Sequence, residues 1–314
     1  MPIWTKNTLQ NRSMDILLFD EFSNHCLANA VEPIRAANTL SDQTLYSWRF
    51  LSLDGGAIQS SSGLRVDTEM VRDSDRQANY LMVISSYGHH ALCTPSNLAK
   101  LRGHAARCQT VVGLDTGAWL LASAGLLKGK KATVHSDLFE AFSEQFVYVN
   151  FAQDRFVEDD NVITCGGAMA AFDMGLHLIG QHHGEALRLD VATLFLQHAE
   201  VSSGDLYKRR INSPLIARAL KLMEDNLEEP IEVRALADHL ACSGKELQRR
   251  FYARFGATPG QVYRHKRLML ARHLMQENML SVSEISVRCG YNNASAMTRA
   301  FKRQFGKPPS YFRR

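Results

Sequence analysis

The sequence of 314 residues lacks the features that mark membrane-bound, secreted and disordered proteins. It contains no run of 18 or more apolar residues, and its first residues do not follow the basic-then-apolar order of a signal peptide. Charged residues make up 22% and hydrophobic residues 45%, so the composition indicates neither a disordered chain nor a coiled coil. We therefore expect a cytoplasmic protein with no membrane partner.

Cysteine is scarce and scattered, and this excludes several kinds of site. The six cysteines have no close pair, so neither a disulfide framework nor a zinc ligand set is indicated. The adjacent pairs His89-His90 and His182-His183 are not followed by a carboxylate or cysteine at ligand spacing. Gly166-Gly167 lacks the lysine and hydroxyl residue of a phosphate-binding loop. We expect no metal, no ATP, no NAD and no other cofactor.

Charge is unevenly distributed along the chain, which is long enough for about two domains. Residues 208–314 hold 21 Lys/Arg and 9 Asp/Glu, a net charge of +12, whereas residues 1–207 hold 15 and 23, a net charge of −8. A compact basic module beside an acidic one is typical of a nucleic-acid-binding domain joined to a second domain. The alternative is a solvated basic surface without a partner.

The basic third contains an internal repeat. Residues 231–263 resemble residues 280–313 at an offset of 49 in the first half and 50 in the second half. Each copy predicts a short helix, a turn and a longer helix that ends before a glycine: 234–241 and 245–255 before Gly256, then 283–289 and 294–305 before Gly306. A long helix over 261–276 would join the copies. The pattern predicts two helix-turn-helix motifs.

The longer helix of each copy has one apolar and one polar face. Apolar residues recur at every fourth position, as in Leu247, Phe251 and Phe255, and would face inward. The outward positions hold the donors that DNA recognition uses: Lys245, Gln248, Arg249 and Arg250 in the first copy, and Ser295, Thr298, Arg299, Lys302 and Arg303 in the second.

These segments resemble the AraC/XylS family of transcription regulators. The resemblance covers about residues 213–314 and rests on LQRRFYARFGATPGQVYRHKRLMLARHLM and ISVRCGYNNASAMTRAFKRQFGKPPSYFR. It implies that Arg249 and Arg299 read bases in double-stranded DNA, with Lys245, Gln248, Ser295 and Thr298 flanking them. The bland alternative is a merely solvated polar face.

The N-terminal two thirds alternates short β-rich runs with helical patterns, which is typical of a parallel α/β sheet. Ligands in such folds bind at the carboxyl ends of the strands. The predicted strands are 16–19, 48–53, 80–85, 110–114, 132–135, 146–151 and 162–165, and the main predicted helices are 24–39, 116–127, 168–181 and 184–200.

One strand end has the spacing of a nucleophile elbow. Gly113-Leu114-Asp115-Thr116-Gly117 follows an apolar run and opens a predicted helix. With His135 and the segments TGAWLLASAGLLKGKKATVH and ITCGGAMAAFDMGLHLI, the layout resembles class I glutamine amidotransferase-like domains of the PfpI type, and in particular the GlxA-like regulators that join such a domain to an AraC-type one. The resemblance implies a flavodoxin-like parallel sheet followed by an all-α domain.

The catalytic residues of that family are largely missing. Asp115 occupies the place of the nucleophilic cysteine, and His25 or Cys26 occupies the approximate place of the acidic residue on the first helix. We therefore interpret the pocket as a retired active site that serves as a sensor, and a carboxylate there favours a cationic amino acid, amine or quaternary ammonium ligand. The candidate ligand-binding residues are Ser85, Ser86, Tyr87, Asp115, Thr116, Trp119 and His135, with Trp119 as a cation–π wall.

Each of these residues also has a structural alternative. Asp115 would cap the helix that follows it, Trp119 would belong to the core, and His135 would be a satisfied buried histidine.

The predicted organisation is a flexible tail over 1–13, a ligand-sensing and dimerisation domain over 14–200, a linker over 201–213 and a DNA-binding domain over 214–314. We expect a homodimeric transcription regulator, an activator, that responds to a small-molecule effector and is not an enzyme. The alternatives are a PfpI-like hydrolase or amidotransferase, with Asp115, Cys26 or Cys165 as the nucleophile, and a non-specific nucleoid-binding protein.

Overall fold

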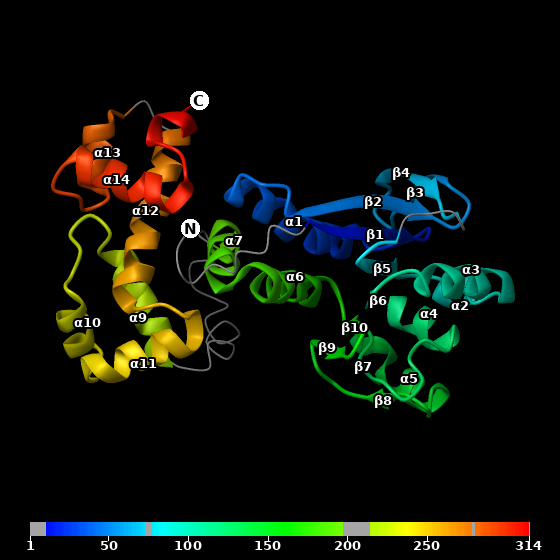
Figure 1. The fold of residues 1–314 in the computed structure, drawn as a ribbon. Helices are drawn as coiled ribbons and strands as arrows, with labels where there is room; N and C mark the ends of the chain where they lie inside the picture. The colour runs from blue at the N-terminus through cyan, green and yellow to red at the C-terminus, as the bar shows by residue number, and fades with distance from the viewer. Residues whose placement is uncertain (1–10, 73–76, 197–213, 278–279, 314) are drawn as a thin grey trace. The chain divides into compact units, whose positions relative to one another are not determined.

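The computed structural model describes residues 11–72, 77–196, 214–277 and 280–313, and the chain divides into two compact units, the first ending at Ile179 and the second beginning at Gly180 (Figure 1). The predicted linker over 201–213 lies outside the described residues, as do the first ten residues of the predicted tail. The first strand begins at Arg12, inside the segment assigned to the tail. Within the described ranges, no helix has the length and apolar character needed to cross a lipid bilayer.

The first unit is built on an eight-stranded sheet with the order β3-β4-β2-β1-β5-β6-β10-β9. The strands β4, β2, β1, β5, β6 and β10 are parallel, and β3 and β9 are antiparallel to their neighbours at the two edges. The order 2-1-5-6-10 within it is the flavodoxin-like arrangement that was predicted. The strands are β1 (Arg12–Leu18), β2 (Tyr46–Ser52), β3 (Gly56–Gln59), β4 (Arg65–Met70), β5 (Tyr80–Ser85), β6 (Thr110–Asp115), β9 (Phe156–Asp159) and β10 (Val162–Cys165).

Helices pack on this sheet and bury apolar residues against it. Leu17, Leu51 and Val83 of the strands join residues of α3, α4 and α5 in a single buried cluster. Helix α1 contacts β2 and packs on α6, where a Cβ at Gly175 would lie 3.3 Å from Pro33. The helices are α1 (Asn24–Ser41), α2 (His89–Leu92), α3 (Pro95–Ala105), α4 (Gly117–Ser123), η1 (Ser136–Leu138), α5 (Phe139–Gln145) and α6 (Ala168–His183).

The predicted strand over 132–135 is wrong in its place and extent. Only β7 (Lys131–Ala132) is extended, and it pairs with β8 (Asn150–Phe151) in a separate two-stranded sheet. After β7 the Thr133 amide donates to the Thr164 hydroxyl, and His135 leads into η1. The edge strands β3, β4 and β9 were not predicted.

In the ranges that the structure describes, the second unit is helical and its apolar residues form two cores. One core joins residues of α7, α9, α10, α11 and the start of α12, and the other joins the rest of α12 to α13, α14 and η2. Both predicted helix-turn-helix motifs are present, and Gly256 and Gly306 end their longer helices with positive φ angles. The elements are α7 (Glu185–Leu196), α9 (Pro214–Asp225), α10 (Val233–His239), α11 (Gly244–Phe255), α12 (Pro259–Glu277), α13 (Val282–Arg288), α14 (Ala294–Phe305) and η2 (Pro309–Phe312).

Candidate functional site

The first recognition helix, α11, is fixed from its inner face. Leu247, Phe251 and Phe255 are buried at spacings of four residues, and the Ser243 hydroxyl accepts a hydrogen bond from the Glu246 amide at the N-cap. Because this face is packed, the opposite face is held outward. Lys245, Gln248 and Arg249 are exposed there, and Arg250 is half-buried.

The second recognition helix, α14, repeats this arrangement. Met297 and Phe301 are fully buried, and the Asn293 side chain accepts from the Ala296 amide at the N-cap. The outward side holds exposed Ser295, Arg299, Lys302 and Arg303 and half-buried Thr298. Each residue predicted to meet DNA is therefore on the outer side of one of the two helices.

The predicted elbow is present at the carboxyl edge of the sheet of the first unit. Asp115 ends β6 with φ at +59°, a backbone conformation that residues other than glycine rarely adopt. The flanking glycines allow the tight turn: a Cβ at Gly113 would lie 2.8 Å from the Ala118 nitrogen, and a Cβ at Gly117 would lie 2.1 Å from the Val83 carbonyl oxygen. The backbone is thus the strained strand-to-helix turn of an elbow, with a carboxylate at its tip.

The neighbouring strand end supplies hydroxyl groups to this turn. Ser85 of β5 lies in register with Asp115, and the Thr116 amide donates to the Ser85 carbonyl oxygen at 3.1 Å. The Thr116 hydroxyl lies 2.9 Å from the Ser86 carbonyl oxygen and 3.1 Å from the Ser85 hydroxyl. Thr116, not Asp115, is the N-cap residue of α4, and it makes no side-chain capping bond. The capping alternative for Asp115 therefore lacks support in the geometry.

Burial sets the electrostatics of Asp115, which is 7% exposed. Desolvation raises the pKa of this carboxyl above its ordinary value, although His135 and hydrogen bonds from Ser86 and Thr116 act in the opposite direction. The thiols near it are affected similarly. Burial raises the pKa of Cys165 to about 12 and that of Cys26 well above its ordinary value, and the charge of Asp115 adds to both shifts.

The remaining candidate ligand residues differ in their placement. His135 precedes η1, is partly exposed, and its ring lies 3.4 Å from the Cβ position of Gly167. Tyr87 is exposed. Trp119 is 1% exposed, and its ring contacts those of His89, His90, Phe142 and Phe146 in the core. The structure brings Ser85, Ser86, Asp115, Thr116 and His135 together, and it assigns Trp119 to the core.

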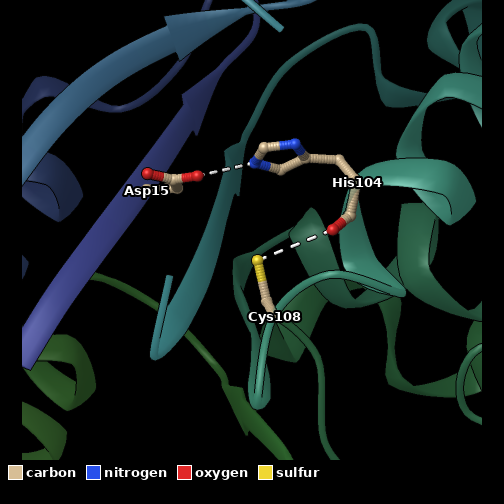
Figure 2. Close-up of side chains that lie close together, drawn as sticks. All are labelled: Asp15, His104 and Cys108. Carbon is tan, nitrogen blue, oxygen red and sulfur yellow. Dashed lines mark hydrogen bonds and ion pairs between the residues drawn. The ribbon is translucent and has the colours of Figure 1, made fainter. Parts of the chain in front are cut away.

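A buried polar cluster lies elsewhere in this unit and was not anticipated from the sequence. Figure 2 shows Asp15 of β1 facing His104 of α3, with Cys108 hydrogen-bonded to the His104 carbonyl oxygen. Arg49 donates to both Asp15 oxygens at 2.7 and 2.9 Å, and the His104 Nε2 lies 2.8 Å from one of them. The second nitrogen of His104 lies 3.2 Å from Arg107.

Asp15, His104 and Cys108 have metal-ligand atoms within 4.8 Å of one another, but the donor set does not suit a cation. Both Asp15 oxygens are held by a guanidinium, and a second arginine contacts His104. Burial raises the pKa of Asp15, but hydrogen bonds from His104 and Arg49 outweigh it, so this pKa lies below its usual value. With a proton on Nε2, His104 donates to Asp15, and its Nδ1 accepts from Arg107. The cluster is an internal ion-pair network.

Helix α7 is part of the second unit. Ala186 and Leu189 lie in the core of the first helix-turn-helix motif, and Glu185 pairs with Arg254 at 2.8 Å. Oδ2 of Asp190 lies 2.7 Å from Nε2 of buried His265. The other ring nitrogen of His265 is hydrogen-bonded to Gln304 of α14. Thus α7 contacts one motif directly and reaches the other through α12.

Comparison with known proteins agrees with both parts of this architecture. Residues 16–181 match the DJ-1/PfpI family, and residues 236–314 match a helix-turn-helix domain. The HTH-type transcriptional regulator GbdR of Pseudomonas aeruginosa is 33% identical over 309 residues, covering 96% of this chain and 84% of GbdR. The chain belongs to the AraC-type transcriptional regulators with a DJ-1/PfpI domain.

Other relatives of this regulator support the same assignment. The HTH-type transcriptional regulator GlxA of Rhizobium meliloti is 32% identical over 307 residues, covering 95% of this chain and 94% of GlxA. The crystal structure of a ThiJ/PfpI family protein from Pseudomonas syringae has a TM-score of 0.54 at 17% identity, covering 82% of this chain and 90% of that one, which supports the fold alone. This regulator therefore acts on double-stranded DNA through its AraC-type domain, and the predicted fold class and DNA-binding function are confirmed.

Proposed function

We propose that this regulator senses a small cationic metabolite at Asp115 and converts its binding into a change in transcription, without catalysing a reaction. The observation that carries the proposal is the buried carboxylate at the tip of the elbow. No lysine or arginine in the described ranges forms an ion pair with Asp115, so a ligand cation would add a counter-charge to the contribution that His135 makes. Ser85, Ser86, Thr116 and His135 surround the carboxylate with hydrogen-bonding groups.

The raised pKa of Asp115 predicts how binding depends on pH. A cation beside the carboxyl favours its ionised form, so binding releases a proton wherever Asp115 is protonated in the free protein. Affinity for a cation then rises as the pH rises through the pKa of Asp115 and levels off above it. A neutral or anionic effector would not give this dependence.

The chemistry of the elbow and of the nearby thiols argues against hydrolysis. A thiol attacks only as its thiolate, and the pKa of Cys165 is about 12, so almost none of it is ionised near neutral pH. The Cys26 thiol is fully buried, and its pKa is higher than usual for the same reason. A carboxylate at position 115 is a much weaker nucleophile than the thiolate for which the elbow is suited.

On the DNA side, we propose that Arg249 and Arg299 read base edges and that the other outward residues flank them. Lys245, Gln248 and Arg250 share the outer side of α11 with Arg249, and Ser295, Thr298, Lys302 and Arg303 share that of α14 with Arg299. We further propose that the regulator is a cytoplasmic homodimer that activates transcription from a paired operator.

A thermal-shift screen of the full chain tests the sensor. We expect a cationic amino acid, amine or betaine to stabilise the protein by about 2.7 kcal/mol when present at 100 times its dissociation constant. Asp115→Asn should abolish this shift, because it removes the charge and keeps the shape. The control is Asp54→Asn, which changes a carboxylate 82% exposed in the same unit and should leave the shift intact.

Two further results would contradict parts of the proposal. A shift that survives Asp115→Asn would place the effector elsewhere. Turnover of ester or amide substrates that Asp115→Asn abolishes would make the pocket an active site.

Oligomeric state is measured separately. We expect sedimentation velocity of the full chain to give about twice the chain mass of 35.2 kDa at micromolar concentration. A species at the monomer mass that binds the operator with full affinity would contradict the dimer.

A further inference from the structure

The first recognition helix carries an acidic residue that holds two of its arginines. The Glu246 carboxylate accepts hydrogen bonds from Arg249 Nε and Nη2, both at 2.9 Å, and from Arg250 Nε at 2.6 Å. These bonds lower the pKa of Glu246 to about 2, so it is ionised at every working pH. Arg249 is 70% exposed, and its guanidinium makes a two-point contact with the Glu246 carboxylate.

The same sequence motif is used differently in α13. Ser243 and Glu246 of α11 have the spacing of a capping box, as do Ser281 and Glu284 of α13. In α13 the Glu284 carboxylate accepts from the Ser281 amide and completes the box. In α11 the Ser243 hydroxyl caps the helix, but the Glu246 carboxylate is directed to the arginines. Glu246 thus binds arginine side chains, whereas a complete capping box would direct its carboxylate to the Ser243 amide.

The second recognition helix, α14, lacks an acidic residue equivalent to Glu246. Ala296 stands where Glu246 stands in the repeat, so Arg299 has no acidic residue one turn before it. The first turn of α14 contains no acidic residue at all, and its last turn holds Lys302 and Arg303. The two motifs therefore present chemically different arginines to DNA, although the arginines occupy equivalent positions.

The geometry around Arg249 defines what it can still bind. A guanidinium has five N–H donors, and Glu246 takes the side edge formed by Nε and one Nη2 donor. Glu246 leaves open the end edge formed by Nη1 and Nη2, and this edge fits the O6 and N7 atoms of guanine. The charge of Arg249 is offset by the carboxylate, so its attraction to phosphate is reduced.

We propose that Glu246 is the specificity-determining positioning residue of the first motif: it holds Arg249 end-on for guanine and withholds it from phosphate. This inference rests on the proposed base-reading role of Arg249. Glu246 acts through the arginine, so its loss should change the balance between specific and non-specific binding and not simply weaken both.

The experiment selects binding sites from a randomised duplex library with the full-length protein and then measures affinity for the selected site, for single-base variants of it and for mixed-sequence DNA. We expect Glu246→Ala and Glu246→Gln to lose preference for guanine at one position and to lower the ratio of specific to mixed-sequence affinity by about tenfold. Binding to mixed-sequence DNA should become more salt-dependent, the slope of log affinity on log salt steepening by about 0.9 for each additional phosphate that the protein neutralises.

Glu284→Gln is the matched control, because it removes the same charge from the same domain without freeing Arg249. It should leave the guanine preference unchanged. If it lowers the specificity ratio as much as Glu246→Gln does, net charge explains the effect and the inference is overturned.

Arg249→Ala separates the inference from its premise. If this variant loses the guanine preference and the Glu246 variants keep it, Arg249 reads the base without help and the inference fails. If Arg249→Ala itself keeps the preference, the base-reading role fails. In the reverse test, Ala296→Glu should increase discrimination by the second motif and reduce its binding to mixed-sequence DNA.

Discussion

Replacing Gly117 with alanine is expected to unfold the DJ-1/PfpI domain or to destabilise it by about 3 kcal/mol or more. The added Cβ would lie 2.1 Å from the carbonyl oxygen of Val83, which is main chain and not a flexible side chain. Val83 lies in the middle of β5, paired with β1 on one side and β6 on the other, so it cannot move without disturbing both ladders. Urea unfolding of the full chain measures the effect through the fluorescence of Trp48 and Trp119, both in this domain.

Gly103→Ala is the control for that change. Gly103 lies in helix α3 of the same domain, and a Cβ there would meet nothing within 4 Å. Alanine is the better helix former, so we expect no loss of stability and a gain of up to about 1 kcal/mol. Equal unfolding midpoints for the two variants would show that the elbow tolerates a side chain at 117.

Asp15→Asn is expected to cost about 3 kcal/mol of unfolding free energy. The substitution keeps the shape of the side chain but removes the ionised carboxylate that binds both Arg49 and His104, although Arg49 keeps its 3.9 Å contact with Glu69. Position 15 is 3% exposed, so water does not reach it to hydrogen-bond with the groups that lose the carboxylate. The exposed pair of Asp54 and Lys100 provides the comparison, because Asp54→Asn there should cost less than about 1 kcal/mol.

The contribution of Asp15 also has a defined pH dependence. Its folded pKa lies below the unfolded value of about 4, so the stabilisation is complete above about pH 4 and is lost as the pH falls through the folded pKa. The wild type should therefore lose its advantage over Asp15→Asn in acid, and the two stabilities should converge. A difference that stays constant down to about pH 2 would mean that the ionised carboxylate is not the source of the stabilisation.

The DNA-binding domain was predictable nearly to the residue because its signals are local. Apolar residues at every fourth position, serine or asparagine before each longer helix and glycine after it define α11 and α14 without tertiary information. Both ends of α11, α13 and α14 lie within one residue of the predicted ranges, whereas α10 ends two residues earlier and α12 begins two residues earlier than predicted. The arginine partner Glu246 was missed, although Ser243-x-x-Glu246 is visible, because that motif predicts capping and not a side-chain pair.

The sheet domain was less predictable because its features depend on distant segments. The core strands are continuous apolar runs, but β3 and β4 are largely exposed, β3 has only four residues and β4 is mostly polar, so nothing local distinguishes them from loops. Asp15 and His104 are 89 residues apart in sequence and meet only through the packing of α3 on β1. Trp119 follows Asp115 by one helical turn, but its environment is set by the rings of His90 in α2 and Phe142 in α5.

At the elbow, the sequence motif predicts the backbone turn but not the environment of the Asp115 side chain. The glycine spacing predicted the turn correctly, since Gly113 and Gly117 make the close approaches that the motif requires. The same spacing could not predict the electrostatics of Asp115, because these depend on burial and on Ser86 after β5 and His135 before η1, which are distant from Asp115 in sequence.

The position of α7 affects where this chain can be divided. A sequence-based division places the cut after residue 200, and a DNA-binding fragment made in this way would lack α7. In the full chain, Ala186 and Leu189 of α7 are part of the core of this domain, and Asp190 is hydrogen-bonded to His265. The turn at Gly184, with φ at +93°, is the better junction, because the structure groups the chain from Gly180 onward with the helical domain. Chimaeras that exchange sensor domains between such regulators should therefore keep α7 with the recipient's helices. Helix α7 then stays with the DNA-binding domain on which it packs.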